Sequence, residues 1–307
     1  MMKKIYILLM IMLLAFVVFG CKNGKNEDNG KINVVATIFP EYDFIRQIAG
    51  DKVNLTLLLP PGSESHSFEP TPKDIVTINK AQLFVYNGGD SDAWVETIIE
   101  SLDTKNIKIV SMMDSVDLLC NEEHDHEHGH EEEYDEHIWT SPKNAIKMVE
   151  KLRDELCAID EANAEFYKEN AKTYINKLEE LDSKFEKTIS EAKRKTIVVG
   201  DRFPFLYFAK AYALSYEAAF PSCSTQSEPS ADTIAKLIDK VKNDNIPVVF
   251  HTELSNTKVC QAICEATGAK EQTLYAVHNI SKVDFEAGVT YLDLMEKNVL
   301  SLQEALN

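Results

Sequence analysis

A run of histidines and acidic residues stands near the middle of the chain. Residues 120–142 read CNEEHDHEHGHEEEYDEHIWTSP. Four histidines are interspersed with acidic residues in its first part, namely His124, His126, His128 and His130. His137 follows in the segment DEHIWTSP. Because neutral imidazole is the commonest metal ligand in proteins, a run this rich in imidazole and carboxylate indicates that the chain handles a divalent transition metal.

One part of this run, HEHGH at 126–130, formally matches the HExxH signature of metalloproteases. That signature requires a helix that brings both histidines to one face. Gly129 and the repeated charges provide no apolar face for a packed helix. The run therefore favours a loop that collects metal over a peptidase site, and a solvated acidic tract with incidental histidines is the alternative.

Three further polar residues stand where buried strands are expected to end. His66 follows the stretch VNLTLLL and a Pro-Pro-Gly turn, Asp201 follows TIVVG, and His278 follows TLYAV. Open α/β sheets bind ligands at the carboxyl ends of their strands. Together with His137, these residues offer three imidazoles and one carboxylate. Such a set favours zinc over manganese, which prefers oxygen-rich sites.

The elements that would position these residues alternate between strand and helix. Buried strands are expected in the first half at 32–39, 53–59, 82–89 and 107–112, and in the second half at 196–200, 247–251 and 273–277. Strands that alternate with helices predict parallel sheets. We therefore expect an α/β fold with two Rossmann-like domains and the metal in the cleft between them.

A long helix is expected to join the two domains. Ser141-Pro142 is a helix-start signal, and a first helix should run to about Ala158. A second should run from Asp160 to roughly Lys193, because its apolar residues recur every three or four positions. At 1.5 Å per residue, this helix would be rigid and about 50 Å long.

The N-terminus has the features of an export signal. Lys3 and Lys4 precede an apolar segment at 5–19, which is short for a membrane span, and Gly20-Cys21 follows. The sequence VFGC resembles a bacterial lipobox. We expect cleavage before Cys21 and lipidation of its thiol, which would anchor the protein to the extracytoplasmic face of the cell membrane. A plain signal peptide with a chance cysteine is the alternative.

These observations predict the domain organisation. The expected parts are a lipoprotein signal peptide at 1–20, a tether at 21–30, an N-terminal α/β domain at 31–142 with the histidine-rich loop 122–133, linking helices at 143–194 and a C-terminal α/β domain at 195–307.

The composition bounds the partners. Of 307 residues 44% are hydrophobic, so a packed core is feasible, and the formal net charge is -18. An anionic body argues against nucleic acid, whose phosphates attract basic patches, and it suits a cation. We expect a monomer without a nucleic-acid partner. The six cysteines include no CxxC pair, which argues against an all-cysteine zinc site.

Three long stretches resemble the metal-binding subunits of bacterial zinc and manganese ABC importers. They are VVATIFPEYDFIRQIAGDKVNLTLLLPPGSESHSFEPTPKDI, AQLFVYNGG and DEHIWTSP, and the similarity extends through EATGAK and YLDLM over nearly all of residues 32–307. The resemblance implies two α/β domains joined by a rigid helix, with the metal held in the cleft as cargo for a membrane permease.

The resemblance also implies a role for each candidate ligand. The first family ligand lies in a PPG-x-x-x-H loop, here His66, and the second in D-x-H-x-W, here His137. The third is usually His in zinc members and Glu in manganese members, and Asp201 stands there. The fourth is usually Asp, and His278 stands there. The two departures keep three imidazoles and one carboxylate.

Two other residues compete for the second-domain positions. His251 and Glu253 also lie at a strand end, and Glu253 matches a family glutamate that is not usually a ligand.

The sequence therefore predicts a lipid-anchored, extracytoplasmic solute-binding protein that captures zinc (Zn²⁺) and delivers it to an ABC import permease. A manganese (Mn²⁺) carrier is the nearest alternative. A zinc-dependent hydrolase with Glu69 or Glu253 as its base, and an adhesion lipoprotein, are the others. Because His must be neutral to bind metal, we expect affinity to fall as the pH drops below roughly 6.5.

Overall fold

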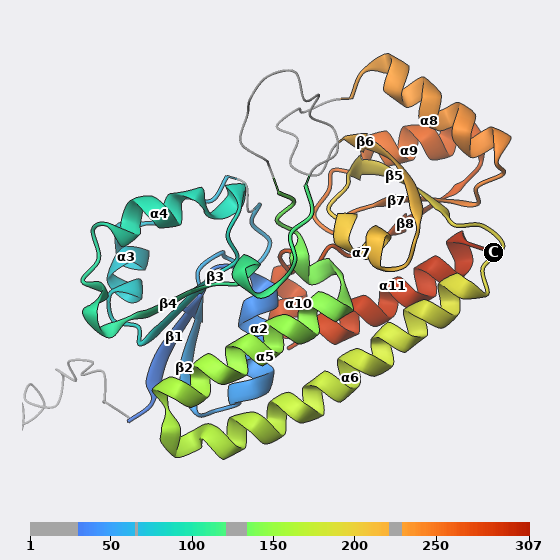
Figure 1. Ribbon diagram of the computed structural model, residues 1–307. Helices are drawn as coiled ribbons and strands as arrows, with labels where there is room; N and C mark the ends of the chain where they lie inside the picture. Colours follow the sequence, from blue (N-terminus) through green and yellow to red (C-terminus); the bar gives the residue numbers. More distant parts are fainter. Residues whose placement is uncertain (1–29, 65–66, 121–133, 221–228) are drawn as a thin grey trace, which may run out of the picture. The chain divides into compact units, whose positions relative to one another are not determined.

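Two four-stranded parallel sheets form the framework of the unit Ile32–Asn307 in the computed structural model (Figure 1). The structure describes residues 30–64, 67–120, 134–220 and 229–307. The predicted signal peptide, the lipidation site Cys21 and most of the tether lie outside the described residues, as do His66 and the histidine-rich loop 122–133. None of the described helices is long and apolar enough to cross a membrane.

The two sheets repeat one topology. The first has the order β2-β1-β3-β4 and consists of β1 (Ile32–Ala36), β2 (Val53–Leu57), β3 (Leu83–Tyr86) and β4 (Lys108–Ser111). The second has the order β6-β5-β7-β8 and consists of β5 (Thr196–Arg202), β6 (Ser215–Phe220), β7 (Val248–His251) and β8 (Lys270–Thr273). All neighbouring strands in both sheets are parallel, which confirms the predicted α/β class.

Each sheet has one face covered by its own helices. On the first sheet these are α3 (Pro72–Ile78) and α4 (Ala93–Ile99), which pack Ile78 and Val95 against Val35 and Phe84. On the second they are α8 (Ala231–Asn243) and α9 (Lys258–Thr267). Successive side chains of a strand point to opposite faces, so the alternate residues of the same strands enter a second core.

That second core is shared by both sheets and by five further helices. It contains residues of α2 (Phe39–Ala49), α5 (Pro142–Ile159), α6 (Ala164–Ser190), α7 (Leu206–Ala211) and α11 (Tyr291–Ala305). Short helices complete the chain: α10 (Lys282–Glu286) and the 3-10 turns Asp90–Asp92, Thr104–Asn106, Met113–Ser115, Ile138–Thr140 and Glu161–Asn163. One continuous core therefore connects the two sheets.

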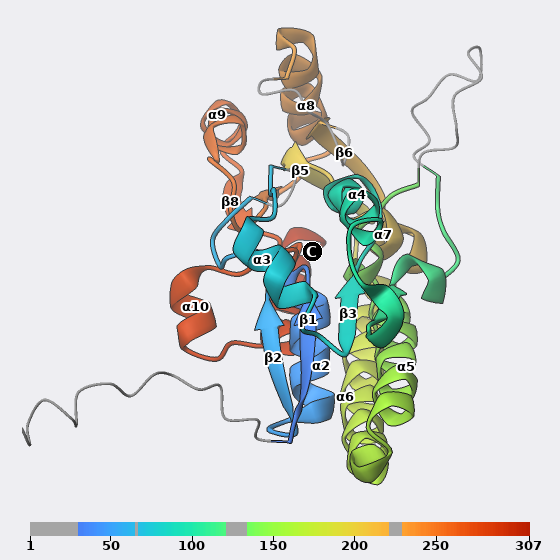
Figure 2. The same cartoon turned by 90° about the vertical axis from the view of Figure 1, so that its left-hand side faces the viewer.

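The long helix α6 is shorter than predicted. It has 27 residues, or about 40 Å, because the 3-10 turn Glu161–Asn163 precedes it and it ends at Ser190. Its predicted apolar face is buried throughout: Tyr167, Ala171, Tyr174, Leu178, Leu181, Phe185 and Ile189. This face packs against α2, α5 and α11, and Figures 1 and 2 show α6 running beside α5. The long helix that joins the two sheets is therefore packed against three other helices.

Two strand predictions in the second half were wrong. β6 was missed because Ser215, Tyr216 and Glu217 are exposed and give no buried apolar run. The strand predicted at 273–277 lies instead at Lys270–Thr273, and His278 therefore stands on a loop past β8. Val277 has a φ of 60°, a left-handed conformation that no strand accommodates.

Candidate metal centre

His137 is held by its own neighbours in the sequence. It precedes the 3-10 turn Ile138–Thr140 that leads into α5, where Ser141 occupies the N-cap position without a side-chain capping bond. The buried carboxylate of Asp135 accepts the backbone N–H of His137 at 2.9 Å and lies 3.2 Å from its Nδ1. A carboxylate on Nδ1 fixes the tautomer in which Nε2 carries the lone pair that can bind a metal.

The electrostatics of His137 follow from this pairing. Burial favours the neutral ring, but the charges of Asp135 and Glu136 and the hydrogen bond that the ring donates to Asp135 outweigh it, so the pKa of His137 is raised above its usual value. The residue is 1% exposed. An imidazole in such an acidic, buried position is electrostatically suited to a cation.

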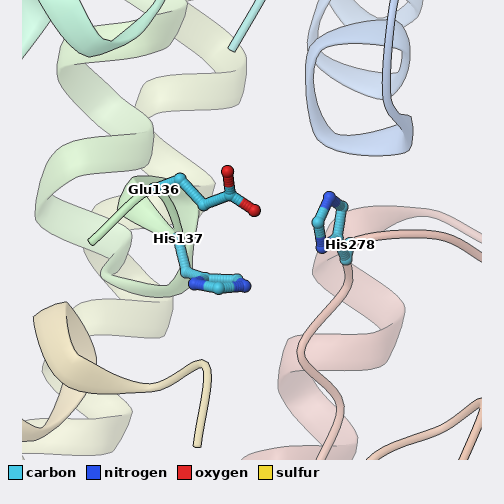
Figure 3. Close-up of side chains that lie close together, drawn as sticks. All are labelled: Glu136, His137 and His278. Carbon is cyan, nitrogen blue, oxygen red and sulfur yellow. The ribbon is translucent and has the colours of Figure 1, made fainter. Parts of the chain in front are cut away.

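His278 reaches His137 from the loop past β8. The two ring centroids are 5.5 Å apart and the planes are nearly perpendicular, at 87°. The ring of Trp139 lies against both, 5.4 Å from His137 and 4.8 Å from His278. Figure 3 shows the two imidazoles facing each other from different parts of the chain. The structure thus brings together two of the four residues expected to bind metal.

A third residue, Glu136, joins this pair and was missed in the sequence. One ligand atom from each of Glu136, His137 and His278 lies within 4.8 Å of the others (Figure 3). The Oε2 of Glu136 accepts a hydrogen bond from the backbone N–H of Ser91 at 2.8 Å, and its Oε1 accepts one from the Ser91 hydroxyl. The only sequence feature that indicates a role for Glu136 in metal binding is its position next to His137. In composition it belongs to the acidic run.

Asp201 lines the same pocket as His137 and His278 but is not part of this close cluster. Its Oδ2 accepts from both the N–H and the hydroxyl of Thr252, at 3.1 and 2.6 Å. Its Oδ1 accepts the N–H of Arg202 at 2.8 Å. These bonds hold the carboxylate in place near the end of β5.

The rival residues have other partners. The Nδ1 of His251 lies 2.8 Å from the carbonyl of Thr252, and its Nε2 lies 3.4 Å from Glu271. Glu253 does line the pocket, but both its oxygens accept backbone N–H groups, from Ala276 and Val277. Of the residues weighed for the last position, it is therefore His278 that the structure places beside His137.

The predicted ligand His66 lies outside the described residues, but the segment before it reaches the pocket. Ser63 and Glu64 line the pocket together with His137 and His278. Asn279 donates its side-chain amide to the carbonyls of Pro60 and Ser63, at 2.9 and 2.8 Å. The residue that follows His278 therefore ties this segment to the other half of the protein.

The described residues on either side of the histidine-rich loop are bonded close to His137. His124, His126, His128 and His130 lie outside the described residues. At the ends of the loop, Cys120 pairs with Tyr134 and Leu119 accepts the N–H of Asp135 at 2.9 Å. The Tyr207 hydroxyl donates to the carbonyl of Asp135 and accepts the N–H of Leu119. The described residues on both sides of the loop thus lie next to Asp135, which orients His137.

Gly89 has no side chain, and the side chain of Glu136 occupies the space that a Cβ at position 89 would need. A Cβ at Gly89 would stand 2.5 Å from the Cβ of Glu136, and the φ of Gly89 is +79°. We expect Gly89→Ala to lower the free energy of unfolding by about 2–4 kcal/mol through strain and overpacking. Thermal unfolding measures this loss.

Gly288→Ala is the matched control, because Gly288 has nearly the same φ, +75°, with nothing within 4 Å of the added Cβ. Equal losses for the two variants would show that the contact with Glu136 has no energetic weight.

The chain matches known proteins along most of its length. Residues 34–305 match the family described as zinc-uptake complex component A, periplasmic (ZnuA). The chain is 36% identical over 309 residues to the zinc-binding lipoprotein AdcA of Streptococcus pneumoniae (strain ATCC BAA-255 / R6), which covers 99% of this chain and 61% of AdcA. It is 35% identical over 291 residues to the high-affinity zinc uptake system protein ZnuA of Bacillus subtilis (strain 168), covering 93% of this chain and 91% of that protein.

The fold has a solved counterpart. The Zn(II)-bound ZnuA-like domain of Streptococcus pneumoniae AdcA has a TM-score of 0.77 to this chain at 33% identity, with 90% of this chain and 99% of that domain covered. The chain therefore spans about 61% of full-length AdcA and nearly all of this domain.

Proposed function

We propose that this chain, which belongs to the ZnuA family of zinc-uptake complex components, captures zinc outside the cytoplasm and delivers it to an ABC import permease. The observation that carries this proposal is the convergence of His137, His278 and a carboxylate in one pocket. The protein would act as a monomer that Cys21 anchors to membrane lipid.

The proposed zinc ligands are His66, His137, His278 and one carboxylate. We assign the carboxylate to Asp201, which lines the pocket at the end of β5, and Glu136 is its rival because it lies closer to the two imidazoles. Three nitrogen ligands and one oxygen favour zinc over manganese.

Carriage fits this pocket better than catalysis. A zinc hydrolase needs a general base within reach of a bound water. The oxygens of Glu253 are held by two backbone N–H groups, and Glu69 is exposed and absent from the residues that line the pocket. A four-ligand site without an open position sequesters an ion and does not activate water.

The carboxylate assignment is tested by zinc titration of the purified protein and two isosteric variants. Structural zinc sites bind with about 10–16 kcal/mol in total, so one of four ligands contributes roughly 3 kcal/mol, or about a hundredfold in affinity. We expect Asp201→Asn to lose about that much and Glu136→Gln to lose less. The opposite ranking would transfer the ligand role to Glu136, and no tight zinc binding by the wild type would refute the proposed function.

The histidine-rich loop is proposed to collect zinc weakly for the main site. Deletion of 122–133 should therefore remove the weak stoichiometry from the titration and leave the tight site intact. A deletion variant that loses the tight site would place part of that site on the loop.

A further inference from the structure

The loop that carries His278 contains a strained residue. Val277 is fully buried, and its φ of 60° lies in the left-handed region that β-branched side chains avoid. Such a conformation persists only where the surrounding structure enforces it. It also sets the direction in which the chain presents the next residue, His278.

One carboxylate supplies much of that enforcement. The Oε2 of Glu253 accepts the N–H of Ala276 at 2.8 Å, and its Oε1 accepts the N–H of Val277 at 2.7 Å. Burial raises the pKa of Glu253 to about 7, whereas these two backbone donors favour the charged form. In a strand, consecutive N–H groups point to opposite sides. A single acceptor for both therefore fixes a turn of the chain at Val277.

The preceding residues of the loop are held from other sides. The Trp139 Nε1 donates to the carbonyl of Ala276 at 2.7 Å. Asn298 on α11 accepts the N–H of Tyr275 and donates to its carbonyl, both at 2.8 Å. The backbone of Tyr275, Ala276 and Val277, the three residues before His278, is thus held by three side chains. These are Glu253 after β7, Trp139 after His137, and Asn298 on α11.

We infer that Glu253 is a positioning residue for metal capture, which fixes the imidazole of His278 beside His137 through the backbone of Ala276 and Val277. This inference rests on the proposed function, in which His278 is a zinc ligand. Glu253 needs no contact with the ion. Neither glutamine nor a shorter acid offers two acceptor oxygens at the same place, since glutamine would turn an N–H₂ group toward one of the two backbone donors.

The test is a double-mutant cycle between Glu253 and His278, measured as the zinc affinity of the purified protein. Removing an outer partner of a metal ligand typically costs about 10- to 100-fold in metal affinity. We expect Glu253→Gln to weaken zinc binding by that factor in the wild-type background and by less than about twofold in the His278→Ala background. Glu265→Gln, which removes an exposed carboxylate on α9, controls for the change of charge.

Cobalt(II) provides a second readout. If Glu253 acts through His278, then Glu253→Gln and His278→Ala should change the visible ligand-field bands of the Co²⁺-loaded protein in the same direction, whereas Glu265→Gln should leave them unchanged. Thermal unfolding of the metal-free proteins shows that each variant is folded. Glu253→Asp, whose oxygens are withdrawn by one methylene, replaces Glu253→Gln if the latter does not fold.

Two results would overturn the inference: an affinity of Glu253→Gln within twofold of the wild type, or an equal loss with and without the His278 imidazole. Both leave the proposed function standing. That function fails separately, when the wild type or the Glu265→Gln control binds no zinc tightly.

Discussion

Replacement of His137 by alanine is expected to lower the zinc affinity of the protein by about two orders of magnitude or more. The estimate shares roughly 10–16 kcal/mol of structural zinc binding among four ligands. His137 should stand at the upper end, because it is 1% exposed and its Nδ1 lies next to the buried carboxylate of Asp135. Without the imidazole, that carboxylate loses its contact with Nδ1 and the ion loses an oriented ligand.

His251→Ala is the matched control for this experiment. His251 also stands at the end of a buried strand, but its nitrogens lie against Thr252, Thr273 and Glu271 and it is not among the residues that line the pocket. Competition titration with a chelator of known affinity measures both variants. Equal affinities for the two histidine variants would remove His137 from the site.

The framework of the fold was predictable because buried strands and amphipathic helices leave a local signal. β1, β3 and β7 are short, mostly apolar runs. The buried residues of α6 recur every three or four positions. β6 lacks that signal because half of its residues are exposed. It is a strand because it pairs in parallel with β5, which its own sequence does not reveal. The boundaries predicted for the domains, at 142 and 195, remain a prediction.

The site was predictable only where a residue's environment is set by nearby sequence. His137 is oriented by Asp135, two residues away. The place of His278 depends on Glu253 and Trp139, which are distant in the sequence and replace the expected strand with a turn. Glu136 depends on Gly89, whose missing Cβ leaves room for it. No local pattern carries such information.

Trp139 connects these distant parts, and we expect Trp139→Ala to affect stability and zinc affinity together. The side chain is fully buried, its Nε1 donates to Ala276, and its ring lies against His137 and His278. Loss of a buried Trp side chain costs about 3–5 kcal/mol. At roughly 2–4 °C per kcal/mol, the melting temperature of the metal-free protein should fall by about 10 °C. The zinc affinity should also fall, because neither imidazole keeps its support.

Trp139→Phe separates the two contributions, because phenylalanine keeps an aromatic ring but leaves the carbonyl of Ala276 without its donor, a loss of about 1–3 kcal/mol. Trp94 on α4 is the control: it packs against Phe68 and Phe84 in the core of the first sheet and is not among the residues that line the pocket. Trp94→Ala should lower the melting temperature and leave the zinc affinity unchanged. Because the chain has two tryptophans, Trp94→Phe leaves Trp139 as the single tryptophan, and its emission should respond to zinc. Equal zinc affinities of Trp139→Ala and Trp94→Ala would mean that Trp139 supports only the core, and that the imidazoles are held by Asp135 and Glu253 alone.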